Sequence, residues 1–402
     1  MLNWVQQFNI FCLLDSQAYS SPDGQAEWLL AVGAADQIQG DATKLLQLDA
    51  FLEGKEWVFG HLSYDLFEVQ SNTNSRYNGS LQFPPFFFFQ PEVLFSLDGV
   101  ELVIHAEYPD AIYKAVLEIE DTLPSSPPKL VISQHLTKEA YVERIEALLA
   151  HIQGGDCYEI NFCQEFFSEG AEISPVAVYQ HLVQVSPTPF SAFYKLNDDY
   201  LLCASPERFL QKKGDTIIAQ PMKGTAKRGA TLEEDARAIK HLRTSAKEQA
   251  ENVMIVDLMR NDLSKICEDG TVKVRELFGI YSFPQVHQMV STIEGKLRRD
   301  IFFSAILEAT FPMGSMTGAP KKRVMELIAQ YESCHRGLYS GSVGYFHNGN
   351  FDFNVVIRSI LYNQTSRYLS YSVGSGITIY SNPEKEWEEC LLKAAAIKKV
   401  LT

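Results

Sequence analysis

The sequence predicts a globular protein that combines helices and strands in one large domain or two. Three observations support this class. The 402 residues can bury a sizeable core, and 46% of them are hydrophobic. Helix-start signals recur along the chain. Between them lie short runs that alternate apolar and polar residues, as strands do.

Residues 1–123 predict a mixed region with several short strands. Strands are expected at 56–64 and 100–106, and the phenylalanine run 86–89, bounded by prolines, predicts a buried strand. No cluster of chemically reactive residues stands out here. The stretch Pro124-Ser125-Ser126-Pro127-Pro128 is typical of a linker, so we place a candidate boundary there.

A helix and a strand open the second part of the chain. Apolar residues at helical spacing predict a helix over about 137–152, which Gly154-Gly155 ends. A strand is expected next, at about 157–167, with its apolar residues on one face. The polar residues of its other face suit either a cleft wall or an exposed sheet face; they are Glu159, Asn161 and Cys163.

A long apolar helix is expected over about 246–266, where Ser245 and Glu248 have the spacing of a capping box. Its composition predicts that it is largely buried. It also carries charged residues, among them Glu251 and Asp257, and charges on a buried helix need ion-pair partners or a metal.

Hairpin and cap signals define the C-terminal part. Asn348-Gly349 predicts a tight hairpin that leads into a strand at 350–361. Another strand, 368–373, runs into Gly374-Ser375-Gly376, which could offer backbone donors to a carboxylate or form only a turn. A last helix is expected after its cap, Asn382.

The overall charge and the cysteines exclude several classes of protein. A net charge of −15 argues against nucleic acid as the main partner. Seven scattered cysteines without a Cys-x-x-Cys motif indicate reduced thiols in a cytoplasm, and neither a disulfide scaffold nor a zinc site. No basic leader precedes an apolar segment, and no apolar run approaches the roughly 20 residues of a membrane helix.

Two Glu-x-x-Glu motifs are the most informative pattern. Glu248 and Glu251 form the first pair, and Glu386 and Glu389 form the second. Residues three apart share one face of a helix, so each pair presents two carboxylates together. Two such faces, brought together, suit Mg²⁺, which prefers carboxylate and water oxygens. Alternatively, both pairs are solvated helix faces, and Glu248 only caps its helix.

Lys223, which follows the expected strand 216–220, is a candidate amine nucleophile. That role needs a neutral amine, so its pKa of about 10.4 must fall through burial or a cationic neighbour. Nearby carboxylates would raise the pKa instead, unless a metal neutralises them. A solvated lysine is the alternative.

Glu207 and Arg358 are further candidates. Glu207 could be a general acid if burial raises its pKa; the alternative is an exposed turn carboxylate paired with Arg208. Arg358 shares an expected strand face with Asp352. It is a candidate bidentate clamp for a carboxylate, or else forms a structural salt bridge with Asp352.

Taken together and in order, these segments resemble the chorismate-utilising enzyme family. The family includes the large components of anthranilate and aminodeoxychorismate synthases, isochorismate synthases and salicylate synthases. The resemblance implies an α+β fold like that of the anthranilate synthase large component, with a two-sheet β-sandwich core flanked by helices. It implies a catalytic domain at 137–402, on which the variable region 1–123 packs. The matching runs are 155–158, 204–207, 221–225, 251–258, 260–263, 314–321, 336–341, 351–354 and 386–389.

The resemblance also implies roles for single residues toward chorismate and Mg²⁺. Glu251 and Glu389 would bind Mg²⁺, with Glu248 and Glu386 close by. Glu207 would protonate the departing C4 hydroxyl. The enolpyruvyl carboxylate would be held by Arg358 and Tyr339, and the ring carboxylate by the metal with Gly374, Gly376 and Lys393. The residues that would also line the site are Gly224, Thr225, His287 and Ser315.

Position 223 divides the reactions of the family. A lysine there is similar to aminodeoxychorismate synthases, in which the amine is thought to attack C2 and ammonia then attacks C4. Glu159 stands where water-adding members have Lys and many amine-transferring members have Gln. It argues against the water-adding reactions.

The resemblance therefore implies a synthase subunit that makes 4-amino-4-deoxychorismate from chorismate and ammonia on the way to 4-aminobenzoate and folate. A separate glutamine amidotransferase subunit would supply the ammonia, because no glutaminase region is visible. Two alternatives are an anthranilate synthase large component and a non-catalytic chorismate-binding subunit with a regulatory role.

Overall fold

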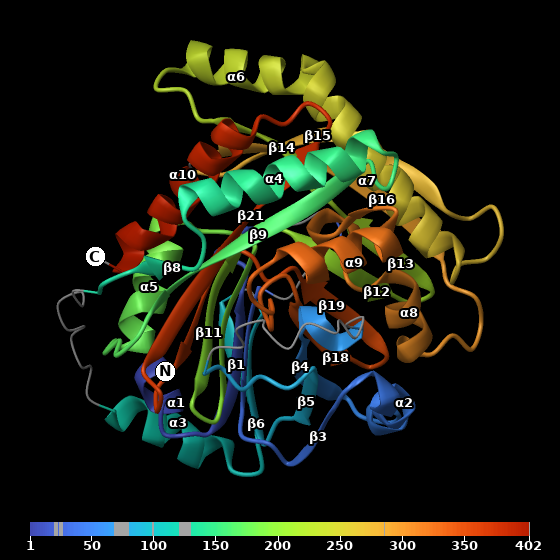
Figure 1. Cartoon of the computed structure of the whole chain (residues 1–402). Coiled ribbons are helices and arrows are strands. Elements are labelled where there is room, and N and C mark those ends of the chain that lie inside the picture. The colour runs from blue at the N-terminus through green and yellow to red at the C-terminus, as the bar shows by residue number, and fades with distance from the viewer. Residues whose placement is uncertain are drawn as a thin grey trace.

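Two large antiparallel β-sheets, packed face to face, form the core of the chain (Figure 1). The computed structural model describes residues 1–19, 23, 27–67, 80–98, 100–119, 130–284 and 286–401. The strand pairings of these residues are antiparallel. Together with the helices, they confirm the predicted α+β sandwich.

The first sheet has 11 strands. Its hydrogen-bonded order begins with β17 (Gly318–Ala319), β9 (Glu159–Ser168), β21 (Tyr368–Thr378), β20 (Ser359–Asn363) and β11 (Asp199–Ser205). It continues with β10 (Phe190–Leu196), β1 (Ile10–Asp15), β2 (Trp28–Val32), β6 (Val93–Asp98) and β7 (Glu101–His105), and β8 (Ser133–Gln134) also pairs with β9.

The second sheet has 10 strands. Its order begins with β14 (Met222–Lys227), β16 (Val286–Lys296), β13 (Thr216–Gln220), β12 (Arg208–Lys213) and β19 (Asn350–Asn354). It continues with β18 (Ser342–His347), β4 (Trp57–Leu62), β5 (Phe86–Gln90) and β3 (Asp36–Gly40), and β15 (Lys273–Ser282) also pairs with β16.

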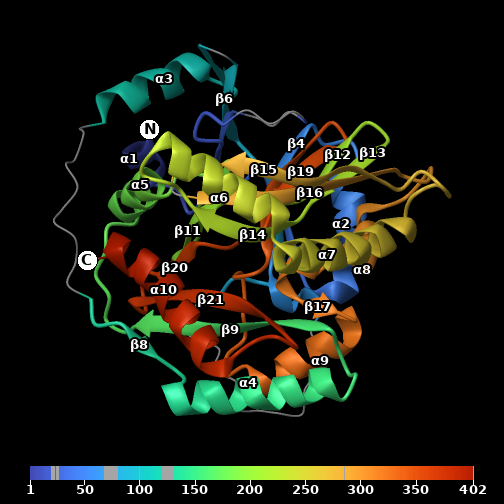
Figure 2. The same ribbon diagram turned by 90° about the horizontal axis from the view of Figure 1, so that it is seen from above.

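Helices cover the outer faces of both sheets (Figure 2). On the first sheet lie α4 (Lys138–Gln153), α5 (Pro175–Val185) and α10 (Pro383–Leu401). On the second lie α6 (Leu232–Thr244), α7 (Ala246–Ser264) and α8 (Phe303–Thr310). The other helical segments are α1 (Leu2–Val5), α2 (Leu45–Leu52), α3 (Pro109–Glu118), α9 (Lys321–Tyr331), η1 (Ala42–Lys44), η2 (Tyr64–Phe67) and η3 (Gly314–Met316).

The four phenylalanines of β5 show how the layers are filled. All four are buried, which confirms the predicted buried strand. Successive side chains of a strand point to opposite faces. Phe86 and Phe88 accordingly pack in the layer between the second sheet and its helices, whereas Phe87 and Phe89 pack between the two sheets.

Several predicted elements and caps are confirmed. Thr137 caps α4 by accepting a hydrogen bond from the Ala140 backbone, and Ser245 caps α7 in the same way. Asn348 and Gly349 both have positive φ, 48° and 74°, as a tight primed hairpin turn requires. These signals are local in sequence, so tertiary packing does not overturn them.

The strand expected over 350–361 is wrong as a single element. β19 belongs to the second sheet and β20 to the first, and residues 355–358 cross between them. Arg358 lies at the end of this crossing with a φ of 50°, an uncommon conformation for a residue other than glycine. It therefore shares no strand face with Asp352.

Two further expectations need correction. Residues Gly374-Ser375-Gly376 form no turn, because they lie inside β21 and pair with β9. Helix α7 is buried on one side only: Asp257 and Arg260 face solvent and form an ion pair at 3.2 Å. Its buried Asp262 pairs with Lys321 at 2.6 Å, as a charge on the inner face must.

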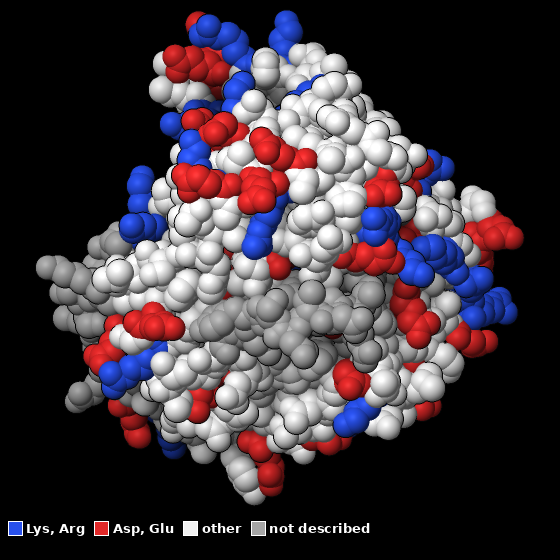
Figure 3. All heavy atoms as spheres, viewed as in Figure 1, with Lys and Arg blue, Asp and Glu red and all other residues white. Residues whose placement is uncertain are grey.

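The N-terminal third contributes strands to both sheets. β1 pairs with β10, and β4 pairs with β18, so this region is interleaved with the later chain. The expected boundary at 124–128 lies outside the described residues. None of the helices in the described part of the chain is long and apolar enough to cross a membrane. On the face seen in Figure 3, basic and acidic side chains are interspersed.

Candidate active site

A buried ion pair between Lys223 and Glu159 is the centre of the candidate site. Lys223 Nζ donates to Glu159 Oε1 at 2.5 Å, and the two side chains are 13% and 2% exposed. The partner oxygen, Glu159 Oε2, is buried and has no hydrogen-bond partner among the described residues. Lys223 follows the expected strand, β13, and itself lies within the next strand, β14, whereas Glu159 begins β9. The pair therefore joins the two sheets.

Two glycines let backbone and side chains approach this pair. A Cβ on Gly376 would lie 2.7 Å from Glu159 Oε1 and 3.2 Å from Lys223 Nζ. Gly318 has a φ of +140°, and its Cβ would lie 2.0 Å from the Glu159 carbonyl oxygen. A larger residue at either position would displace the pair or the β17–β9 contact.

The pKa of Lys223 is raised above its ordinary value. Burial lowers it, but the ion pair with Glu159 and the charges of Glu251 and Glu207 raise it by more. The amine is therefore protonated in this arrangement, and it must lose a proton before it can act as a nucleophile.

Glu207 lies between β11 and β12 and is only 5% exposed. Burial raises the pKa of its carboxyl to about 7, against the lowering effects of the Ser315 side chain, the Lys223 charge and the Met222 backbone. Its proton is thus available near neutral pH. The alternative of an exposed carboxylate paired with Arg208 is wrong, because Arg208 binds Asp352 through two hydrogen bonds of 2.8 and 2.9 Å.

Arg358 offers a guanidinium to a ligand. Asp352 is engaged by Arg208, so a structural salt bridge between Arg358 and Asp352 is excluded. The Arg358 side chain makes no hydrogen bond or ion pair with any residue that the structure describes. Burial lowers its pKa. A shielded guanidinium with free donors suits a carboxylate in bidentate geometry.

Glu248 and Glu251 lie in the first turns of α7, which packs against β14. A Cβ on Gly224 would lie 2.9 Å from Glu248 Oε2, so the glycine leaves room for this carboxylate. Burial raises the pKa of Glu251, against the charges of Lys247 and Lys223. The Glu248–Glu251 pair therefore lies beside β14, the strand that carries Lys223.

Glu386 and Glu389 lie in the first turns of α10. The Ser375 hydroxyl of β21 donates to Glu386, and this serine is next to Gly376. Lys393 pairs with the exposed Glu389 at 2.7 Å and donates to the Gly374 carbonyl at 2.9 Å. β21 thereby connects the α10 carboxylates to the Lys223–Glu159 pair.

The donor chemistry of these four glutamates fits a hard divalent cation, because all their ligating atoms are carboxylate oxygens. Within the described part of the chain, their oxygens form no group of three within 4.8 Å of one another. The arrangement is open, as suits an ion such as Mg²⁺ that keeps several waters and takes oxygens from a ligand.

Of the remaining predicted residues, Ser315 and Thr225 lie beside Glu207 and on the Lys223 strand, whereas His287 and Tyr339 have other surroundings. Ser315, in η3, is buried beside Glu207, and Thr225 is exposed on β14. His287 is fully buried and bonded to Asp235 at 2.9 Å and to Ser282 at 2.8 Å, which is a structural environment. Tyr339 is buried near Cys163 and lines a cavity of about 280 Å³ whose lining does not include Lys223.

Sequence reasoning missed two residues that support the site. Ser375 donates a hydrogen bond to Glu386, and its only sequence signal is its position between Gly374 and Gly376. Arg336 is buried and donates to the Asn161 and Met316 carbonyl oxygens, each at 2.7 Å. An arginine in an otherwise apolar, glycine-rich run is the signal that could have indicated it.

A family model described as chorismate binding enzyme matches residues 11–399. The chain therefore belongs to the chorismate-binding enzyme family. Solved structures share the fold. Anthranilate synthase component I from Streptococcus pneumoniae TIGR4 has a TM-score of 0.79 at 24% identity, over 94% of this chain and 93% of that chain. The menaquinone-specific isochorismate synthase from Escherichia coli has 0.83 at 16% identity, over 100% and 91%.

Curated relatives are more similar in sequence. The chain is 42% identical over 287 residues to the chloroplastic aminodeoxychorismate synthase of Arabidopsis thaliana, covering 69% of this chain and 31% of that protein. It is 40% identical over 268 residues to aminodeoxychorismate synthase component 1 of Escherichia coli, covering 66% and 58%. An anthranilate synthase component I-like protein of Synechocystis is 33% identical over 350 residues, 85% and 72%. The chain thus spans about a third of the plant relative.

We expect Glu207→Gln to stabilise the protein at pH 8 by up to about 3 kcal/mol while abolishing most turnover. The folded-state pKa, about 7, lies above the ordinary 4.5, so wild-type stability falls as pH rises from 4.5 to 7. A neutral glutamine escapes that loss. Urea unfolding of both proteins at pH 5 and pH 8 measures their free energies of unfolding. If the difference between the two proteins is the same at both pH values, the buried-acid assignment is contradicted.

We expect Glu159→Gln to shift the rise of kcat with pH to lower pH at saturating Mg²⁺. Glu159 contributes most of the charge that raises the pKa of Lys223, so its removal favours the free amine. A pH–rate profile of both proteins tests this. An unchanged profile would show that this ion pair does not control the amine.

Proposed function

We propose that the chain is an aminodeoxychorismate synthase subunit, which converts chorismate and ammonia into 4-amino-4-deoxychorismate. The observation that carries the proposal is the position of Lys223, buried against Glu159 and within the electrostatic range of Glu207. The named aminodeoxychorismate synthases among its relatives support the same reaction.

The substrate is a dicarboxylate, and the chain offers one cationic region for each carboxylate. Arg358 binds the enolpyruvyl carboxylate, and Tyr339 would assist. The ring carboxylate lies toward β21 and Lys393. Mg²⁺, held by Glu251 and Glu389 with Glu248 and Glu386 close by, would supply positive charge beside that carboxylate.

Lys223 acts as the nucleophile in the proposed reaction. Its ammonium proton passes toward Glu159, whose second oxygen has no partner among the described residues. The amine forms a bond to C2 of the ring as the C4–O bond breaks, and Glu207 gives its proton to the departing hydroxyl, which leaves as water. Ammonia then forms the C4–N bond, and the C2–N bond to Lys223 breaks.

The ammonia would come from a glutamine amidotransferase partner. The relative from Escherichia coli is named component 1, a name that implies a second component of that enzyme. We place the protein in the cytoplasm, in keeping with seven buried cysteines that form no disulfide. Its product would serve 4-aminobenzoate and folate synthesis.

The rival activity is anthranilate synthesis, which the Synechocystis relative's name suggests for that protein. The isolated chain, incubated with chorismate, Mg²⁺ and ammonium, should yield a product with the mass of aminodeoxychorismate and no anthranilate fluorescence. Direct formation of anthranilate would overturn the proposal. Absence of any turnover, with chorismate still bound, would favour a non-catalytic chorismate-binding subunit.

Lys223→Ala should reduce turnover to background while chorismate binding persists, because the covalent step loses its nucleophile. Lys227→Ala, on the exposed part of the same strand, is the matched control and should keep wild-type turnover. Stopped-flow and mass analysis of trapped enzyme measure both steps. Full turnover by Lys223→Ala would refute the covalent role.

Arg358→Ala should raise the KM for chorismate roughly 10- to 100-fold, since hydrogen bonds to a charged group contribute about 1.5–3 kcal/mol. The exposed Arg260, which pairs with the exposed Asp257, provides the control Arg260→Ala. Steady-state kinetics with varied chorismate decides the point. An unchanged KM for Arg358→Ala would remove the clamp from the proposal.

A further inference from the structure

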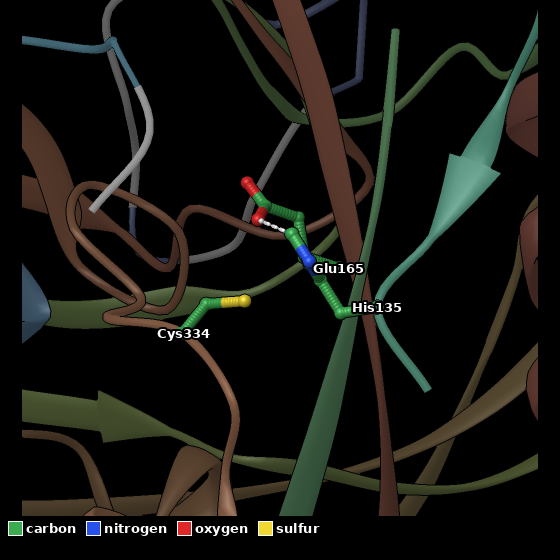
Figure 4. A group of neighbouring side chains, drawn as sticks. All are labelled: His135, Glu165 and Cys334. Carbon is green, nitrogen blue, oxygen red and sulfur yellow. Dashed lines mark hydrogen bonds and ion pairs between the residues drawn. The ribbon is translucent and has the colours of Figure 1, made fainter. Parts of the chain in front are cut away.

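Three segments that are far apart in the sequence bring a histidine, a glutamate and a cysteine together (Figure 4). His135 precedes α4, Glu165 lies in β9, and Cys334 lies three residues after the end of α9. One ligating atom of each residue lies within 4.8 Å of the other two, and His135 Nε2 is 3.0 Å from Glu165 Oε2. The cluster is well shielded: Cys334 is 8% exposed.

The strand register and a ring contact hold this cluster in place. β8 pairs with β9 so that Gln134 lies opposite Phe166, which brings the next residue, His135, beside Glu165. The His135 ring stacks on Phe167 with centroids 4.4 Å apart and an interplanar angle of 18°. The imidazole plane is therefore fixed before any ligand binds.

We propose that His135, Glu165 and Cys334 form a Zn²⁺ site. Thiolate, imidazole and carboxylate are the ligand types that Zn²⁺ takes, with three protein ligands and an open fourth position in many sites. A tetrahedral ion with these ligands needs ligand atoms about 3.3–3.6 Å apart, so side-chain shifts of about 1 Å complete the geometry. On binding, the Cys334 thiol releases its proton to solvent and the sulfur bonds the metal.

The chemistry of this cluster differs from that of the four glutamates on α7 and α10. Sulfur and nitrogen ligands select Zn²⁺ over Mg²⁺, whereas an all-carboxylate set suits Mg²⁺. Glu165 also lines the cavity of about 280 Å³, together with Tyr371 and Tyr339. This space can admit the water that would fill the fourth position.

A cysteine protease-like role for the same trio is excluded. Burial, with the Glu165 charge, raises the pKa of the Cys334 thiol to about 12, so a free thiolate is scarce at neutral pH. The imidazole is engaged by the carboxylate, with His135 Nε2 3.0 Å from Glu165 Oε2. The remaining alternative is a hydrogen-bonded trio that binds no metal.

Metal at this cluster would restrain a segment that supports the candidate active site. Cys334 lies two residues before Arg336, which donates to the Asn161 carbonyl of β9. Tyr339 follows three residues later. The Zn²⁺ proposal itself does not depend on the reaction proposed above, because it rests on different side chains.

The test uses the full chain, stripped of metal with a chelator and kept reduced. Co²⁺ is added in the presence of saturating Mg²⁺, and the thiolate-to-cobalt charge-transfer absorption is recorded; Zn²⁺ then competes for the bound Co²⁺. We expect one equivalent of Co²⁺ per chain. Cys334→Ser should remove the absorption, and His135→Ala should weaken affinity at least about tenfold.

Two control variants separate this site from others. Glu386→Gln should leave the absorption unchanged, so failure of the Mg²⁺ assignment and failure of the Zn²⁺ assignment give different results. Cys157→Ser, a buried cysteine outside the cluster, should also leave it unchanged. If Cys334→Ser does not fold, His135→Ala and Glu165→Gln test the site instead, and both should weaken Co²⁺ affinity. No absorption in the wild type, or an equal one in all cluster variants, would overturn the proposal.

Discussion

The Lys223–Glu159 ion pair is the interaction on which the candidate site depends. It connects β14 of the second sheet to β9 of the first sheet, and both side chains are shielded from water. Removing one partner of a buried pair leaves an uncompensated charge, which typically costs about 3–5 kcal/mol. Gly318 and Gly376 lie where an added Cβ would collide with Glu159 or Lys223. The glycine backbone therefore leaves the space that the Lys223–Glu159 salt bridge occupies.

Two buried carboxyls lie near the same lysine in different environments. Glu159 accepts a hydrogen bond from Lys223 Nζ at 2.5 Å. Burial raises the pKa of Glu207 to about 7. The proposed reaction therefore uses Glu159 to take a proton and Glu207 to give one. Environment alone separates the two roles, since the side chains are chemically identical.

How much of the fold and the candidate site can be predicted from the sequence depends on how far apart in the chain the interacting residues lie. Caps such as Thr137 and the Asn348-Gly349 turn are set by neighbouring residues, and they were predictable. The carboxylate pairs on two helices also followed from spacing. The crossing at 355–358 did not, because the apolar run Val355-Val356-Ile357 continues the strand-like sequence while the chain changes sheets. Likewise, only tertiary structure shows that Arg208 takes Asp352 and leaves Arg358 its donors.

The polar face of β9 carries residues of both the Lys223–Glu159 ion pair and the proposed Zn²⁺ site. Glu159, Asn161, Cys163 and Glu165 alternate along one side of the strand, and all are buried or largely so. Sequence allowed either a cleft wall or an exposed sheet face, and burial excludes the second. The absence of a Cys-x-x-Cys motif argues against a zinc site, but such motifs detect only ligands close in sequence. Here β9 supplies one ligand and distant segments supply the rest, so only the fold can reveal the set. In the two proposals, this strand provides the proton acceptor, Glu159, and a metal ligand, Glu165. Those residues are six positions apart, so rigid pairing with β21 couples the position of one end to that of the other.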